Sequence, residues 1–188
     1  VLTAEDYGNY NNPPMQACSW EIEKADFDMS NVSWNYEEAF VYDGWIKEIN
    51  LTGLPEGLEA KCRGTSAENA GAYLADAELS YDTENYNEPI LLPCPWEIRK
   101  AQYDMSRVVW EKEDDFIYDG TEKNVYLTQL PPGVSAVYEN NRKTNAGEYC
   151  ASAVLSYDEN NYEKPLVEDF PWEIRKAEYD MSGVHWNY

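Results

Sequence analysis

The side chains that could carry out acid–base chemistry are few in this chain of 188 residues. His185 is its single histidine, and Glu113, Asp114 and Asp115 form a run of neighbouring carboxylates. Paired carboxylates can hydrolyse glycosidic bonds, whereas a charged run more often forms a solvated surface. The sequence contains no motif of a serine hydrolase, a zinc protease or a phosphate-binding loop. We therefore expect that the protein is not an enzyme.

Two short loops gather oxygen-bearing side chains in the same order, first at Asp82, Glu84 and Asn85 and again at Asp158, Asn160 and Asn161. Carboxylate and amide oxygens are ligands that Ca²⁺ accepts. The spacing is not that of an EF-hand, because the loops have no glycine at the sixth position and no glutamate at the twelfth. Two interpretations stay open: a calcium site, and a turn in which the side chains bond to the backbone.

Aromatic residues in or near these loops are the candidates for contact with a host surface glycan or protein. Tyr86 and Tyr162 stand beside amide side chains, so each could stack on a sugar ring. Packing against the neighbouring repeat would explain the same tyrosines. Trp45 differs, because Thr121 stands at the matching place in the next unit. A tryptophan found in only one unit is the sharper candidate for a partner contact.

The charge of the chain excludes several classes of partner. It has 36 acidic and 14 basic residues, with a formal net charge of -22 at pH 7, so phosphate backbones and anionic membrane surfaces would repel it. The apolar run over residues 89–96 is far shorter than the roughly 20 residues that cross a bilayer. We expect neither nucleic-acid binding nor membrane insertion.

A repeat with a fixed period organises the chain. The triplet "WEI" recurs at Trp20, Trp96 and Trp172, at intervals of 76 residues, and "YDG", "NAG" and "DMS" recur at the same interval. This predicts the end of an upstream repeat over 1–23, whole repeats over 24–99 and 100–175, and the start of a downstream repeat over 176–188. Neighbouring repeats in the same chain are then expected to contact one another, within a longer array.

Each repeat shows the alternation of apolar and polar residues that half-buried strands require. The clearest strand is expected over 73–81, with its copy over 149–157. Further strands are expected over 58–62 and 94–98, and the first strand of the unit over 25–34. Turn residues separate these runs, and no stretch has a helical period. The predicted fold class is all-β, with tandem Ig-like β-sandwich repeats of about 76 residues.

The cysteines suggest a covalent link within the first repeat. Cys62 and Cys94 both fall in the predicted core-facing phase, and the second repeat replaces both by aromatic residues, Tyr138 and Phe170. Replacement of both together favours a contacting pair, so we predict a disulfide between Cys62 and Cys94 that contributes about 3 kcal/mol. The sequence offers no partner within the chain for the remaining cysteines, Cys18 and Cys150.

Residues 116–162, "FIYDGTEKNVYLTQLPPGVSAVYENNRKTNAGEYCASAVLSYDENNY", resemble the YDG and MBG type Ig-like repeats of bacterial surface proteins, particularly large adhesins. The most specific elements are Tyr-Asp-Gly at 118–120, the Leu-Pro-x-Gly turn, and Asn-Ala-Gly at 145–147. The resemblance implies an extracellular location at the cell surface and brings no catalytic residues or cofactor.

Two functions of different classes fit a repeat of this kind. The repeats could form a stalk or spacer in an adhesin, which would require shared core and turn residues and tolerate divergent surfaces. Alternatively, the repeats could themselves bind host glycan, mucin or protein, with weak sites strengthened by multivalency. Residues 98–105 contain neither glycine nor proline. Because this connection lacks the composition of a flexible linker, the sequence favours the stalk.

Overall fold

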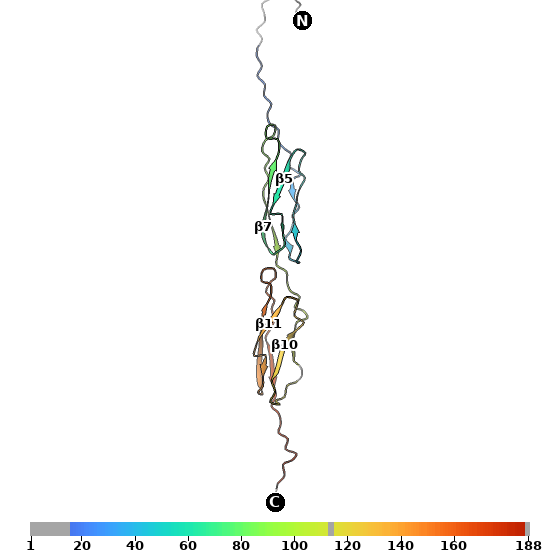
Figure 1. The fold of residues 1–188 in the computed structure, drawn as a ribbon, viewed down its shortest axis with the longest axis vertical. Coiled ribbons are helices and arrows are strands. Elements are labelled where there is room, and N and C mark those ends of the chain that lie inside the picture. Colours follow the sequence, from blue (N-terminus) through green and yellow to red (C-terminus); the bar gives the residue numbers. More distant parts are fainter. Residues whose placement is uncertain (1–15, 113–114, 187–188) are drawn as a thin grey trace, which may run out of the picture.

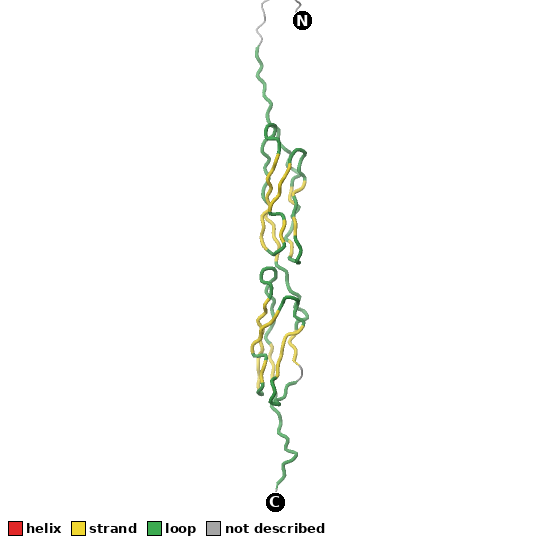
Figure 2. The backbone as a smooth tube through the Cα atoms, viewed as in Figure 1, coloured by secondary structure: helices red, strands yellow, loops and turns green. Residues whose placement is uncertain are grey.

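The computed structural model describes residues 16–112 and 115–186, which form two β-sandwiches arranged end to end along the long axis of the molecule (Figure 1). These residues are strands, turns and loops without a helix (Figure 2), so the predicted all-β fold class is confirmed. No helix within the described ranges is long and apolar enough to cross a membrane.

The first sandwich contains eight strands, which are β1 (Ser33–Trp34), β2 (Phe40–Val41), β3 (Lys47–Glu48), β4 (Leu51–Thr52), β5 (Glu59–Arg63), β6 (Ser66–Ala67), β7 (Gly71–Ser80) and β8 (Cys94–Arg99). Its larger sheet has the order β2-β8-β7-β5, in which β2 runs parallel to β8 and the other pairs are antiparallel. The pairs β1-β4 and β3-β6 belong to the opposite side, and Ile49 between β3 and β4 is fully buried against β7 and β8.

The second sandwich repeats this plan with the strands β9 (Val109–Lys112), β10 (Lys123–Thr128), β11 (Ser135–Glu139), β12 (Arg142–Lys143), β13 (Gly147–Ser156) and β14 (Phe170–Ile174). One sheet has the order β11-β13-β14 and the other β12-β10-β9. A parallel bridge between Ile117 and Arg175 takes the place of the β2-β8 pair. Both long central strands, β7 and β13, lie where the alternating pattern predicts them.

The tryptophans of the second and third "WEI" triplets are each the centre of a core, whereas Trp20 of the first triplet is exposed. Trp96 is buried between Phe40 and Tyr73, and its Nε1 donates a hydrogen bond to the carbonyl oxygen of Gly64 at 2.8 Å. Trp172 takes the same place in the second sandwich, where its Nε1 donates to the Asn140 carbonyl oxygen at 3.2 Å. A buried indole N–H needs a partner, and a backbone turn supplies it in each sandwich.

The expected strand over 25–34 is wrong for most of its length. Only Ser33 and Trp34 form a strand, and Ala25 makes an isolated bridge. The "DMS" triplet between them closes a turn, in which the Ser30 N–H donates to Asp28 Oδ1 at 3.0 Å and the Val32 N–H donates to the Met29 carbonyl at 3.1 Å. An aspartate that binds the backbone two residues later favours a turn over a strand.

The predicted disulfide between Cys62 and Cys94 is also wrong, and all four cysteines are free. Cys62 lies opposite Ala77 in the β5-β7 pair, and Cys94 lies opposite Ala75 in the β7-β8 pair. Strand β7 therefore separates the two cysteines by two strand spacings, and their partners are two residues apart along β7, so the cysteines lie more than about 9.5 Å apart. A disulfide requires Cα atoms within about 7 Å.

The aromatic residues that replace these cysteines share a neighbour. The rings of Tyr138 and Phe170 lie 5.7 and 5.8 Å from the ring of Trp110. The Tyr138 hydroxyl also accepts a hydrogen bond from the Leu127 N–H of the opposite sheet at 3.1 Å. The paired replacement therefore reflects packing against one tryptophan, because the two positions lie on β11 and β14, the strands on either side of β13, and both rings contact Trp110.

Candidate functional site: the junction between the sandwiches

The residues shared by the two repeats meet where the sandwiches adjoin (Figure 1). The first sandwich contributes Tyr42 of its "YDG" triplet and Asn69 and Ala70 of its "NAG" triplet. The second contributes Asn161 and Tyr162 from the loop that follows β13. Three repeated motifs that lie far apart in the sequence thus form one contact, which we call the junction.

Asn161 ties the two sandwiches together through its side-chain amide. Its Oδ1 accepts a hydrogen bond from the Ala70 N–H at 2.8 Å, and its Nδ2 donates to Asn69 Oδ1 at 3.2 Å. The same Nδ2 donates to Asp158 Oδ2 at 2.9 Å. Asn161 is only 6% exposed and is the one buried polar residue among those described. Its burial is tolerated because oxygen and nitrogen both have partners.

Tyr162 adds an aromatic contact to the same junction. Its ring stacks on Tyr103 of its own sandwich at 4.0 Å and meets the edge of Tyr42 of the first sandwich at 5.5 Å. Pairs of this geometry contribute about 0.5–1.5 kcal/mol each beyond the area they bury. Burial, followed by the nearby carboxylate of Asp158, raises the pKa of the Tyr42 hydroxyl. The junction therefore favours the neutral, protonated form of the Tyr42 side chain.

The chain that connects the sandwiches is itself hydrogen-bonded at the junction. Lys100 Nζ donates to the Glu159 carbonyl at 2.5 Å, and the Ala101 N–H donates to the Asn161 carbonyl at 2.9 Å. The Glu163 N–H returns a bond to the Ala101 carbonyl at 2.8 Å. A hinge needs backbone that is free to rotate, and these residues are fixed to the second sandwich on both sides of Ala101.

A carboxylate braces the loop that carries Asn161 and Tyr162. Asp158 Oδ1 accepts from the Asn160 and Asn161 N–H groups at 3.0 and 3.3 Å. The bond from the Asn161 side chain, followed by these backbone bonds, holds the pKa of Asp158 below its usual value despite partial burial. The turn interpretation of this loop accounts for both oxygens of the carboxylate.

The matching loop of the first sandwich has the same internal bonds. Asp82 accepts from the Glu84 N–H at 3.0 Å and from Asn85 Nδ2 at 2.8 Å, and Lys24 Nζ donates to the Thr83 carbonyl at 2.7 Å. Within the described part of the chain, no group of three or more His, Cys, Asp or Glu residues is arranged to hold a metal ion. Calcium binding at either loop remains a prediction.

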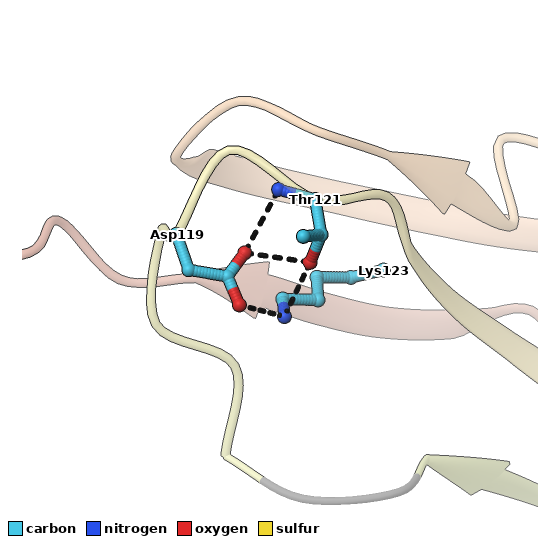
Figure 3. A network of polar contacts seen from close by, with 3 residues as sticks. All are labelled: Asp119, Thr121 and Lys123. Carbon is cyan, nitrogen blue, oxygen red and sulfur yellow. Dashed lines mark hydrogen bonds and ion pairs between the residues drawn. The ribbon is translucent and has the colours of Figure 1, made fainter.

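The "YDG" triplet forms a hydrogen-bonded turn in both sandwiches, and in the first sandwich this turn carries Tyr42 of the junction. In the second sandwich, Asp119 accepts hydrogen bonds from the Thr121 N–H at 2.9 Å, from Thr121 Oγ1 at 2.6 Å and from Lys123 Nζ at 2.7 Å (Figure 3). The bond from Lys123, followed by those from Thr121, holds the pKa of Asp119 far below its usual range. Gly120 supplies the φ of 80° that lets the turn close.

The first sandwich builds the same turn with Asp43, which accepts from the Trp45 N–H at 3.0 Å and pairs with Lys47 at 2.5 Å. The "NAG" triplet is fixed in a comparable way, because the Tyr73 hydroxyl donates to the Asn69 carbonyl at 2.6 Å. Tyr149 makes the matching bond to the Asn145 carbonyl at 2.8 Å. Both motifs therefore form local hydrogen bonds that hold Tyr42, Asn69 and Ala70 in position.

The three predicted contact aromatics have different surroundings. Tyr162 packs against the neighbouring sandwich at the junction, as one of its two interpretations expected. Tyr86 is half-buried and stacks on Phe27 at 4.3 Å, at the opposite end of the first sandwich. Trp45 is 75% exposed, and its neighbours Val41 and Ile46 are exposed as well. Trp45 is therefore the one of the three that presents its ring to solvent.

The remaining candidate residues do not form a group. His185 and Cys150 are exposed, as is Cys18. Asp115 pairs with Lys112 at 3.1 Å, while Glu113 and Asp114 of the same run lie outside the described residues.

Tyr42, Asn69 and Ala70 are contact residues that were not predicted from the sequence. Their signal was the recurrence of polar and aromatic motifs at positions where the core does not require them. We compared the chain with protein-family models, with curated proteins and with solved structures, and none of these comparisons gave a match.

Proposed function

We propose that this chain is a non-catalytic extracellular spacer of a bacterial surface protein, in which each repeat is locked to the next. The observation that carries the proposal is the contact of one sandwich, through the buried Asn161 and the half-buried Tyr162, with Tyr42, Asn69 and Ala70 of the other. A spacer must keep its two ends a fixed distance apart, so it needs contacts that prevent bending between its units.

The junction resists bending because hydrogen bonds and an aromatic contact both join the two sandwiches. A rotation that opens the contact with Ala70 would leave the side-chain oxygen of the buried Asn161 without its hydrogen-bond donor, at a cost of about 1–3 kcal/mol. A movement that separates Tyr42 from Tyr162 would also lose the aromatic contact between the sandwiches. Domains joined by a free linker move independently by default, whereas here several specific contacts oppose that motion.

The distribution of shared and divergent residues supports a structural role. Shared residues lie in the core, as Trp96 and Trp172 do, or in braced turns, as Asp43 and Asp119 do. Exposed strand positions diverge in character, for example from Lys61 to Val137. The resemblance of the "YDG" and "NAG" motifs to repeats of bacterial adhesins supports the extracellular location, and the acidic composition is compatible with it.

A second candidate function is direct binding of host glycan, mucin or protein by the repeats. The observation that favours it is the exposure of three apolar side chains around the "YDG" turn of the first sandwich, Val41, Trp45 and Ile46, which we call the apolar patch. The second sandwich has Thr121 and Glu122 in the places of Trp45 and Ile46. An exposed tryptophan is a frequent anchor in contacts with sugars and proteins. In this case the stiff array would present Trp45, and the two functions would coexist in one chain.

Small-angle scattering of matched variants tests the spacer function. Asn161→Ala combined with Tyr162→Ala removes the junction contacts, and Asn85→Ala combined with Tyr86→Ala makes the same changes in the loop at the far end of the first sandwich. The junction pair should shorten the mean particle and broaden its distance distribution, while the control pair should leave both unchanged. Equal scattering from both variants would contradict a locking role for the junction.

A further inference from the structure

Two hollows adjoin at the junction. The first, of about 460 Å³, is lined by β7, β8 and the connecting chain, and the second, of about 260 Å³, is lined by residues of the second repeat. Gln102 and Glu163 line both hollows, so the two form one groove, which we call the junction groove. Ligand sites frequently lie where two domains meet, and a volume of roughly 300–1,000 Å³ is usual for them.

The two residues at the centre of the groove differ from the matching pair of the first repeat, which is Asp26 and Asn87. Those two side chains bond to each other, because Asn87 Nδ2 donates to Asp26 Oδ1 at 2.8 Å. Gln102 and Glu163 are exposed, and neither side chain bonds to another described residue. The junction groove therefore carries an amide and a carboxylate that are free to bind a ligand, where the first repeat has a closed pair.

The groove has a polar half and an apolar half. In the polar half, Arg99 Nε donates to Glu97 Oε1 at 2.8 Å. In the apolar half, Met105, Pro165 and Leu166 form the surface, and Leu166 is 77% exposed. A sugar ring has hydroxyl groups at its edge and C–H groups on its faces. Planar polar side chains beside an apolar surface match both.

The charges that line the groove are balanced. The carboxylates of Glu97 and Glu163 stand against the cationic groups of Arg99 and Lys100. The chain as a whole has a formal net charge of -22, so its field repels anionic ligands, while the two cations oppose a cationic ligand at the groove itself. A neutral ligand satisfies both conditions.

The backbone at the groove is already hydrogen-bonded. Ile98 is paired with Gly71, the Arg99 carbonyl accepts from the Tyr42 N–H at 2.9 Å, and both polar groups of Ala101 bond to the loop that follows β13. An extended peptide gains affinity from main-chain bonds to an open strand edge, which these residues do not provide. The bonding groups that remain are side chains, and this favours a saccharide over a peptide.

We propose that the junction groove binds a neutral oligosaccharide. Gln102 donates to and accepts from its hydroxyl groups, Glu163 accepts from them, and Leu166 packs against the face of one ring. The closed pair in the first repeat leaves one such site in the two whole repeats. This binding goes beyond the spacer function, and it rests on the closed junction, because residues of both sandwiches line the groove.

An NMR titration of the isotope-labelled 188-residue chain tests the proposal. The probes are neutral oligosaccharides of glucose, galactose, mannose and N-acetylglucosamine, each raised to about 10 mM so that a millimolar affinity is detected. At least one should shift the side-chain amide signals of Gln102 and the backbone signals of Glu163 and Leu166, with saturation at a single site. Sialylated and sulfated forms of the same oligosaccharide should bind more weakly.

A charge-neutral exchange is the decisive variant. Gln102→Asp with Glu163→Asn places the closed pair of the first repeat in the groove without changing the net charge. It should weaken binding by roughly ten-fold or more, since both free bonding groups are lost, while the remaining spectrum keeps its folded pattern. The matched control, Asp26→Ala with Asn87→Ala, should bind as tightly as the unmodified chain.

Three results would overturn the proposal: no shift from any of the neutral oligosaccharides, an unchanged affinity in the exchanged variant, and tighter binding of extended peptides at the same signals. Residual dipolar couplings of the same sample separate this failure from that of the spacer function. One alignment tensor together with any of these results would contradict the groove alone, whereas two tensors would contradict the spacer function.

Discussion

The side-chain oxygen of Asn161 accepts a hydrogen bond from the backbone N–H of Ala70 at 2.8 Å, across 91 positions of the sequence. This bond joins two sandwiches that each have their own core. An amide side chain can be buried in this way only while both of its polar atoms keep partners. The orientation of one sandwich against the other is therefore coupled to the hydrogen bonding of a single residue.

Replacing Asn161 by alanine should destabilise the protein by about 1–3 kcal/mol, because Ala70 and Asn69 lose buried partners while Asp158 loses a donor. Asn85→Ala removes only the matching bond to Asp82, so it should cost less. Denaturant unfolding of both variants checks this, and their difference isolates the contact between the sandwiches. Equal losses would show that Asn161 acts only within its own loop.

Acid should loosen the loop at the junction below about pH 4. The pKa of Asp158 is lowered in the folded protein, so the carboxylate contributes stability that is present above its unfolded value of 3.8 and is lost as the pH falls through the lowered value. Titration of the Tyr162 and Asn161 NMR signals checks this. Asp158→Asn should remove the transition, and a transition well above pH 4 would contradict the bracing role of the carboxylate.

Replacing Gln129 by glycine should stabilise the folded protein. It has a φ of 57°, and the matching residue of the first sandwich is Gly53 with a φ of 78°. The left-handed conformation costs a non-glycine residue roughly 1 kcal/mol, so Gln129→Gly should raise the free energy of unfolding by about that amount. Gly53→Ala should lower it, since a Cβ there would lie 2.0 Å from the Asn31 carbonyl oxygen. Chemical denaturation of both variants measures the two effects, and a loss of stability in Gln129→Gly would refute the strain.

Trp45→Thr places the residue of the second repeat into the first. Because Trp45 is largely exposed, the substitution should leave the melting temperature within a degree or two, in line with the small effects of surface changes. If the patch binds a host ligand, capture on mucin glycoproteins or a glycan array should be lost in this variant. Capture that is equal for both proteins would exclude Trp45 as the contact.

The thiols should react at different rates. Cys62, Cys18 and Cys150 are exposed, whereas Cys94 is partly buried and burial raises the pKa of its thiol. Because the thiolate is the reactive form, Cys94 should be alkylated last, and all four should react without reductant. Peptide mapping after timed exposure to iodoacetamide gives the order. A residue that reacts only after reduction would restore the case for a disulfide.

Local patterns were sufficient to predict the all-β fold and its main strands. The alternation over 73–81 and 149–157 depends only on which face of a strand is buried, and the structure forms β7 and β13 there. The same logic failed for Cys62 and Cys94, because both face one side of the same sheet and β7 lies between them. The alternation of side chains along a strand determines on which face of the sheet a residue lies. It does not determine which strands are neighbours in that sheet.

The junction could be predicted only in part. Tyr162 stood between two interpretations, ligand contact and packing against a neighbouring repeat, and no local pattern separates them. Tyr42 lies 120 positions before its partner Tyr162, and Asn69 lies 92 positions before its partner Asn161, so their proximity follows from the arrangement of two complete sandwiches. The "DMS" turn was misread because Asp28 bonds to the backbone within what otherwise resembles an alternating strand.

Residual dipolar couplings of the unmodified protein test the central claim most directly, because they report the orientation of each sandwich against a common frame. If the contacts of Asn161 and Tyr162 lock the two sandwiches, the couplings of residues 24–99 and 100–175 will fit a single alignment tensor of one magnitude. Two tensors of clearly different magnitude would show that the sandwiches move independently, and the account of the chain as a stiff spacer would then be wrong.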